Sequence, residues 1–265
     1  MKVASIIFKE RQFNLFQDRQ YFKTKIKEWL DCCIEGGTNI VVFPGLIGYI
    51  YGNYERYLEH VLDISLQYKD LYICTGSYFE TDKDETYHSS SIITNGRICL
   101  SQRQLYLAKW EKKLGLSRGY EIQFTEINGL KTAILLTTDM FYPQVSRYLA
   151  MSKVDLVLAP SAIKDGRNMA LQISGLWQNV QQNLFFAIES GFKGELFDCK
   201  FFSRSAIYGP LEMTDKDNGF IRLEKNDNEV EILTAQLDNE KRMAAIKKFD
   251  TLKQLNIDLY KDLFR

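Results

Sequence analysis

Histidine and cysteine are the residue types here best suited to hold a metal ion or to act as nucleophiles. His60 falls on a charged helical pattern and His88 at the start of a strand-like segment, without the His-x-x-x-His spacing of a metal site. We therefore expect both histidines at the surface and no bound metal. The five cysteines are odd in number and form no Cys-x-x-Cys pair, which favours reduced, mostly buried thiols. They are Cys32, Cys33, Cys74, Cys99 and Cys199.

Several other kinds of chemistry lack their sequence motifs. There is no Gly-x-Gly-x-x-Gly, no Gly-x4-Gly-Lys-Ser/Thr and no Gly-x-Ser-x-Gly, so no nucleotide cofactor and no serine-hydrolase elbow is expected. Lys+Arg and Asp+Glu are both 34, and this balance argues against nucleic acid or an anionic membrane as a partner. No apolar stretch approaches the roughly 20 residues of a membrane span, and the apolar N-terminal run lacks a signal-peptide pattern. We expect a cytoplasmic protein without a cofactor.

The pattern of apolar residues alternates between strand and helix periods along the chain. Asn-Gly pairs at 95–96 and 128–129 predict two β-hairpins within this alternation. The 45% apolar and 26% charged composition favours one domain spanning 1–265, with a helical tail from about 239. The expected helices follow Asp18 and cover 54–65, 143–151 and 168–182. The expected strands are 3–8, 39–43, 71–79, 89–94, 97–101, 122–127, 130–136, 154–159, 184–189, 204–208, 220–223 and 230–237.

Three segments carry a resemblance to a known family. They read Ile-Val-Val-Phe-Pro at 40–44, Arg-Gln-Leu-Tyr-Leu at 103–107 and Leu-Leu-Thr-Thr-Asp-Met-Phe-Tyr-Pro at 135–143. In this order they resemble the strand ending in Pro-Glu, the Arg-Lys-x-His-Leu segment and the Cys-x-Asp-x-x-Phe/Tyr-Pro elbow of the carbon-nitrogen hydrolases, the nitrilase superfamily. The resemblance runs over nearly the whole chain. It implies an α/β fold of α-β-β-α type, a four-layer sandwich of two mixed sheets between helices.

The resemblance also implies that the hydrolytic residues of the family are replaced. Gly45 stands at the position of the general base Glu, Gln104 at that of the oxyanion-stabilising Lys, and Thr137 at that of the nucleophilic Cys. A thiolate, a base and a cation each serve one step of amide or nitrile hydrolysis, so their joint absence predicts little turnover. We expect the three positions to cluster in the fold. We expect the Thr137 hydroxyl to cap the turn that follows it.

Further residues are implied to border the same site. Glu111 matches the family's second Glu, although neighbouring lysines make a solvated charged loop an equally good explanation. Asp139 is expected to bond backbone amides at a helix start. Cys199, in a loop and beside Lys200, is a possible alternative nucleophile. The residues expected to bind a ligand are Glu111, Thr138, Asp139, Tyr142 and Asn183.

Three functional hypotheses follow. The first is a pseudoenzyme that binds a small molecule, regulates or joins a complex, and forms a homodimer through helices 143–151 and 168–182, as the resemblance implies. The second is a hydrolase of carbon-nitrogen bonds with a rewired site, in which Cys199 or Thr137 is the nucleophile. The third is a structural protein without a ligand, whose old pocket is filled by side chains.

Overall fold

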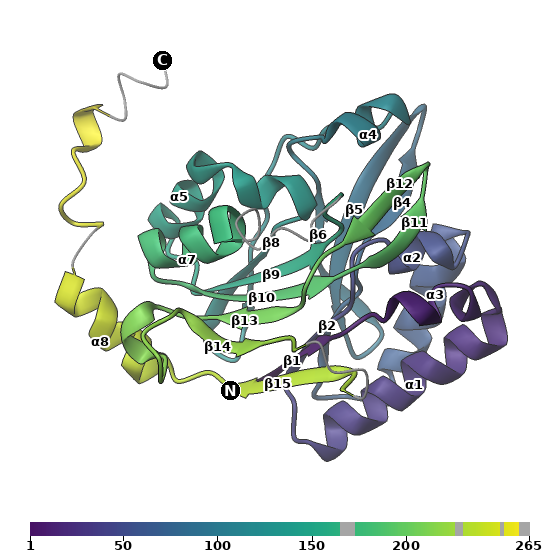
Figure 1. The fold of residues 1–265 in the computed structure, drawn as a ribbon, viewed down its shortest axis with the longest axis horizontal. Helices are drawn as coiled ribbons and strands as arrows, with labels where there is room; N and C mark the ends of the chain where they lie inside the picture. Colours follow the sequence, from purple (N-terminus) through teal and green to yellow (C-terminus); the bar gives the residue numbers. More distant parts are fainter. Residues whose placement is uncertain (165–172, 226–229, 250–251, 260–265) are drawn as a thin grey trace.

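Two mixed β-sheets form the body of the protein (Figure 1). The computed structural model describes residues 1–164, 173–225, 230–249 and 252–259. One sheet has seven strands and the other six, and a short hairpin, β11 (Lys193–Leu196) with β12 (Cys199–Phe202), extends beyond them. None of the described helices is both long and apolar enough to span a bilayer.

The first sheet has the order β15-β1-β2-β3-β5-β4, with β6 paired to β5. Its centre is parallel: β2 lies between β1 and β3, and all three of its residues are buried. A β-branched apolar run of this kind fits a strand covered on both faces. The strands are β1 (Lys2–Ile6), β2 (Ile40–Val42), β3 (Tyr72–Cys74), β4 (Tyr78–Asp82), β5 (Glu85–Thr94), β6 (Arg97–Arg103) and β15 (Ile232–Gln236).

The second sheet has the order β14-β13-β10-β9-β8-β7. Strands β8, β9 and β10 run parallel, and β9 is buried along its whole length. The strands are β7 (Thr125–Ile127), β8 (Leu130–Ile134), β9 (Leu156–Ser161), β10 (Phe186–Gly191), β13 (Ala206–Tyr208) and β14 (Phe220–Leu223).

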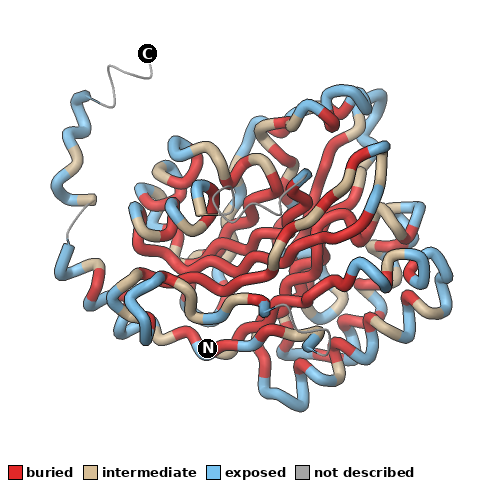
Figure 2. The backbone as a smooth tube through the Cα atoms, in the orientation of Figure 1, coloured by how far each residue is buried: buried red, intermediate tan, exposed pale blue. Residues whose placement is uncertain are grey.

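Three apolar cores separate four layers. One core packs α1 (Arg19–Glu35) and α3 (Tyr54–Ser65) on the first sheet, and another packs α5 (Pro143–Met151) and α7 (Gln178–Asn183) on the second. The third lies between the sheets, where Val3 and Ile40 share a cluster with Leu156. Figure 2 shows the strands as a buried centre inside partly exposed helices. The predicted α-β-β-α sandwich is confirmed. Shorter helices are α2 (Ile47–Ile50), α4 (Lys109–Lys113) and α8 (Asn239–Phe249).

Both predicted hairpins are present. Asn95-Gly96 and Asn128-Gly129 have positive φ at both turn residues, as a type I′ turn requires. The single strand expected over 71–79 is wrong, because Gly76 takes φ +71° and divides it into β3 and β4. A Cβ on Gly76 would lie 2.3 Å from the Pro44 carbonyl oxygen, so the chain bends where two backbones approach closely.

The helix expected over 168–182 is not continuous. Its first part, 168–172, lies outside the described residues. The remainder consists of a π-helical turn, η4 (Ile173–Trp177), followed by α7, with a non-helical backbone at Gly175. A Cβ on Gly175 would lie 2.8 Å from the ring of Phe141, so the kink lets this segment pack tightly against the elbow region.

Candidate functional site

Gly45 lies three residues beyond the end of β2. Its N–H donates to the Ser190 carbonyl across a long 3.4 Å bond. A Cβ built on Gly45 would lie 2.5 Å from the carbonyl oxygen of Ser161 and 3.0 Å from the amide nitrogen of Ala162. The backbone that leaves β9 therefore fills the space in which any side chain at position 45 would begin.

Thr137 occupies a strained elbow three residues beyond the end of β8 in the second sheet. It opens the 3-10 turn η3 (Thr137–Phe141) with φ +31°, a conformation that β-branched residues rarely adopt. Its hydroxyl accepts a hydrogen bond from the Ala162 N–H at 3.2 Å. The expectation that this hydroxyl caps its own turn is wrong, because the adjacent strand end offers a buried amide. Thr137 and Gly45 thus meet at the same peptide.

Gln104 is completely buried in the segment after β6. Its Nε2 donates to the Tyr106 carbonyl and to Glu111 Oε2, both at 2.8 Å. Its Oε1 has no hydrogen-bond partner among the described residues. The side chain therefore offers a neutral amide and one buried acceptor where a cation is expected from the resemblance.

Glu111 is also fully buried, which contradicts the solvated-loop explanation. Its Oε2 accepts from the Ala108 N–H at 2.6 Å as well as from Gln104, and its Oε1 lies 2.6 Å from His88 Nδ1. The short helix α4, capped at Ala108, turns this carboxylate inward and leaves the lysines of the same helix outside.

His88 is buried on β5, so the expected surface position is wrong. Its Nε2 lies 2.6 Å from Ser77 Oγ, which itself accepts from the Leu46 N–H at 2.7 Å. The serine can then donate its proton to Nε2, and this leaves Nδ1–H to donate to Glu111. A continuous chain of hydrogen bonds therefore joins the residue after Gly45 to Gln104. The uncharged run Ser89 to Ile93 beside His88 was the sequence signal for a strand buried on both faces.

Asp139 is buried and bonds backbone amides, as expected, but not at a helix start. Its carboxylate accepts from Leu105 N–H at 3.0 Å and from Tyr106 N–H at 2.8 Å. Burial raises the pKa of Asp139 to about 7, against the lowering effect of these amides. Tyr142 stacks on Tyr106 at 3.7 Å between ring centroids. Both residues hold the segment that carries Gln104.

A cavity of about 610 Å³ opens beside the elbow. Thr137, Thr138 and Cys199 line it, and Cys199 is the buried first residue of β12 rather than a loop residue. Glu111, Asp139 and Tyr142 are not among the residues that line it. Asn183 is not brought to this cavity: it ends α7, where its Nδ2 donates to the Asn179 carbonyl, and it borders a different hollow under α8.

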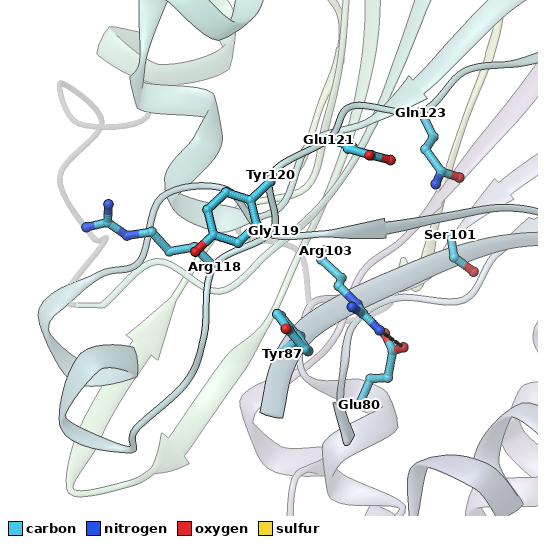
Figure 3. Close-up of a pocket in the computed structure, with 9 residues that line it drawn as sticks. All are labelled: Glu80, Tyr87, Ser101, Arg103, Arg118, Gly119, Tyr120, Glu121 and Gln123. Atoms are coloured by element: carbon cyan, nitrogen blue, oxygen red, sulfur yellow. Dashed lines mark hydrogen bonds and ion pairs between the residues drawn. The ribbon is translucent and has the colours of Figure 1, made fainter. Parts of the chain in front are cut away.

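A second cavity, of about 420 Å³, lies over β4, β5 and β6 (Figure 3). Arg103 is its central cation, and it is held by Glu80, by Asp82 and by the Tyr87 ring 4.0 Å away. Its charge is therefore already compensated within the fold. Across the described residues, His, Cys, Asp and Glu side chains form no group of three that could hold a metal ion.

No protein-family model and no curated protein matches the sequence. Solved structures do resemble the chain. A mutant of the Nesterenkonia AN1 amidase from the nitrilase superfamily matches with a TM-score of 0.80 at 16% identity, covering 99% of this chain and 97% of that one. A second match is an amidase from Nesterenkonia sp. AN1 with the acetamide moiety of fluoroacetamide added covalently at its active-site cysteine. Its TM-score is 0.79 at 16% identity, and the match covers 99% of this chain and 96% of that one. A carbon-nitrogen hydrolase from Helicobacter pylori G27 matches with a TM-score of 0.79 at 18% identity, covering 100% of this chain and 97% of that one.

These likenesses extend over both sheets and the helices that cover them, since nearly the full length of each chain is matched. At such low identity they speak for the architecture alone. The chain has the fold of the nitrilase-superfamily amidases.

Proposed function

We propose that this protein is a non-hydrolytic member of the nitrilase fold that binds a small molecule and acts as a regulatory or complex-forming protein. The observation that carries the proposal is the crowding at Gly45, where a Cβ would lie 2.5 Å from the Ser161 carbonyl oxygen. Real Cβ atoms essentially never approach a backbone atom so closely. This crowding supports the proposal, because a side chain that could act as a general base would require the backbone at Ser161 to move.

The remaining groups do not replace the lost chemistry. An alkoxide at Thr137 needs a positioned base, and its hydroxyl oxygen faces the Ala162 amide. Gln104 offers an amide in place of a cation, and a neutral donor stabilises a developing negative charge less than a cation does. Glu111 is tied to His88, Gln104 and the Ala108 amide. Each group is thus used in holding the fold.

The test is intact-mass spectrometry after incubation with amides, nitriles and N-carbamoyl compounds. We expect an unmodified protein, because the thiolate and base that form a covalent intermediate are missing. An adduct on Cys199 or Thr137 would overturn the proposal. Cys199→Ala and Thr137→Ala locate such an adduct, and Cys32→Ala, an exposed thiol away from the cavity, is the control for nonspecific labelling.

The second candidate function is a rewired carbon-nitrogen hydrolase. The observation that favours it is that Cys199 and Thr137 line the same cavity, with Asp198 as the one carboxylate among its described lining residues. In this scheme Asp198 would act as the base for one of the two nucleophiles. Loss of turnover in Asp198→Asn together with an adduct on wild type would support it.

A purely structural role is less well supported. That reading requires the old pocket to be filled by side chains, whereas a cavity of about 610 Å³ lies beside Thr137. This volume is within the range of small-molecule sites. A binding role therefore accounts for a feature that a structural role leaves unexplained.

A homodimer through α5 and the 168–182 segment is part of the proposal. The α5 helix exposes Tyr148 (52%) and Met151 (49%), two large apolar side chains that are three residues apart and therefore neighbours on the helix surface. Light scattering on wild type and on Tyr148→Glu tests this: we expect a dimer that the substitution weakens, and a monomeric wild type would contradict it.

The proposed cytoplasmic location is supported by five free cysteines.

A further inference from the structure

The cavity beside Thr137 has one wall of aromatic rings. Trp110 and Phe197 line it, with ring centroids 5.4 Å apart and planes inclined by 12°. Phe79 continues the stack, 5.7 Å from Phe197. Stacked rings of this kind favour a planar, apolar body in a bound ligand.

The turn that supplies this wall is held in an unfavourable conformation. Phe197 and Asp198 connect β11 to β12, and both have φ +54°. A two-residue turn of this type prefers Asn-Gly, and a bulky residue at positive φ is a genuine outlier. The stacking of Phe197 against Trp110, Phe79 and Tyr49 retains the turn in spite of that cost. The fold therefore keeps this ring at the cavity.

The charge around the cavity is predominantly positive, although the chain as a whole has formal net charge zero. Lys109, Lys113 and Lys164 line it against one carboxylate, Asp198. Within the described chain, no carboxylate forms an ion pair with Lys109 or Lys113. The lining thus attracts an anion at short range, where screening is weakest.

The polar groups at the elbow are suited to the same kind of ligand. The Thr137 hydroxyl accepts from Ala162 N–H, so its own proton is directed to another acceptor. Thr138 adds a second hydroxyl to the lining. Three lysine ammonium groups against one carboxylate favour an anionic carboxylate ligand over a neutral amide.

We propose that this cavity binds a small organic carboxylate with a planar apolar body, in preference to the corresponding neutral amide. The inference rests on the proposed non-hydrolytic function, because it treats the cavity as a binding site only. It names the chemical class of the ligand: an acid in place of the carboxamide on which an amidase acts.

Isothermal titration calorimetry with phenylacetate and its near-isostere phenylacetamide tests the preference. We expect phenylacetate to bind about tenfold more tightly at low salt, and the difference to shrink in high salt as the lysines are screened. Equal affinity for the two compounds, or no binding of phenylacetate at millimolar concentration, would overturn the proposal.

Charge-reversal variants locate the site. Lys109→Glu and Lys113→Glu should each weaken phenylacetate binding at least about fivefold while leaving phenylacetamide unchanged. Lys112→Glu is the matched control: it makes the same charge change at another exposed lysine of the same helix, and Lys112 does not line the cavity. Equal weakening by Lys112→Glu would show a general field effect and would overturn the assignment. Circular dichroism of each variant verifies that it is folded.

The same samples separate this inference from the proposed function. Release of ammonia from phenylacetamide, or a covalent adduct, contradicts the non-hydrolytic function. Absence of phenylacetate binding without hydrolysis contradicts the ligand class alone. Tight binding of phenylacetate, together with no hydrolysis of phenylacetamide, supports both the non-hydrolytic function and the ligand class.

Discussion

The region around Gly45 and the region around Glu111 are neighbours in this fold, and they are built in opposite ways. At Gly45 the backbone of Ser161 and Ala162 fills the space of a side chain. At Glu111 a buried carboxylate keeps three hydrogen-bond partners. The first region is closed by backbone packing, whereas the second holds a polar network. A substitution near Gly45 should therefore lower the stability of the fold through steric crowding, and a substitution near Glu111 should lower it by leaving polar groups without partners.

The largest effect is expected from Gly45→Glu. The new side chain would meet the Ser161 carbonyl at its first carbon and would also bury a carboxylate without a cation. We expect a loss of at least about 4 kcal/mol in the free energy of unfolding, or failure to fold. Urea unfolding measures it, and Gly36→Ala, at a helix end with φ −74°, is a mild control.

Gly45→Ala and Gln104→Lys divide this effect into its parts. If steric crowding dominates, Gly45→Ala alone should cause most of the loss in the free energy of unfolding that Gly45→Glu causes. Adding Gln104→Lys to Gly45→Glu should then recover only the part of that loss that comes from the buried charge. Coupling of about 0.5–3 kcal/mol is typical of residues in contact. Strict additivity in this double-mutant cycle would show that the two positions do not share a buried site.

The second effect concerns pH and Asp139. Its folded pKa is raised to about 7 from an ordinary value of 3.8, chiefly by burial, so the folded state holds a proton that the unfolded state has released. The corresponding stability is fully present below about pH 4 and is lost as pH rises through 7. At about 1.4 kcal/mol per pKa unit, wild type should lose up to about 4 kcal/mol relative to Asp139→Asn between pH 4 and 8. Parallel stability curves for the two proteins would contradict this.

A third, intermediate effect is expected from Glu111→Gln. The amide cannot accept from His88, Gln104 and Ala108 at once, so buried donors are left without partners. We expect a loss of about 2–3 kcal/mol. Glu126→Gln, the same change on exposed β7, should stay within about 0.5 kcal/mol. Similar losses for both variants would mean that the network does not stabilise the fold.

The smallest effect is expected at Thr137. Thr137→Val removes the acceptor of the Ala162 N–H and should cost about 1 kcal/mol, whereas Thr137→Ser keeps it and should be nearly neutral. Thermal unfolding of the pair distinguishes a hydroxyl effect from a packing effect. A loss for Thr137→Ser as large as that for Thr137→Val would assign the role to the methyl group.

Much of the architecture could be predicted from local patterns. The Asn-Gly hairpins and the apolar run at 40–42 specify their structure within a few residues, and the structure agrees. The strand over 71–79 could not be divided from the sequence, because the bend at Gly76 depends on the Pro44 carbonyl, which is distant in sequence.

The interior of the site was less predictable. The burial of His88 is set by β3, β4 and β6 pairing around β5, and that of Glu111 by the inward turn of α4. The Thr137 hydroxyl bonds Ala162 because β8 and β9 end side by side. These are tertiary contacts between segments distant in sequence, so local patterns could not predict them.

The most direct test of the account is the rate of ammonia release from phenylacetamide by wild type, Thr137→Ala and Cys199→Ala. We expect all three proteins to match the buffer blank, because Gly45 has no side chain that could act as a base. Turnover by wild type of about 1 per second or faster, within the usual enzymatic range, and lost in one of the variants, would contradict it.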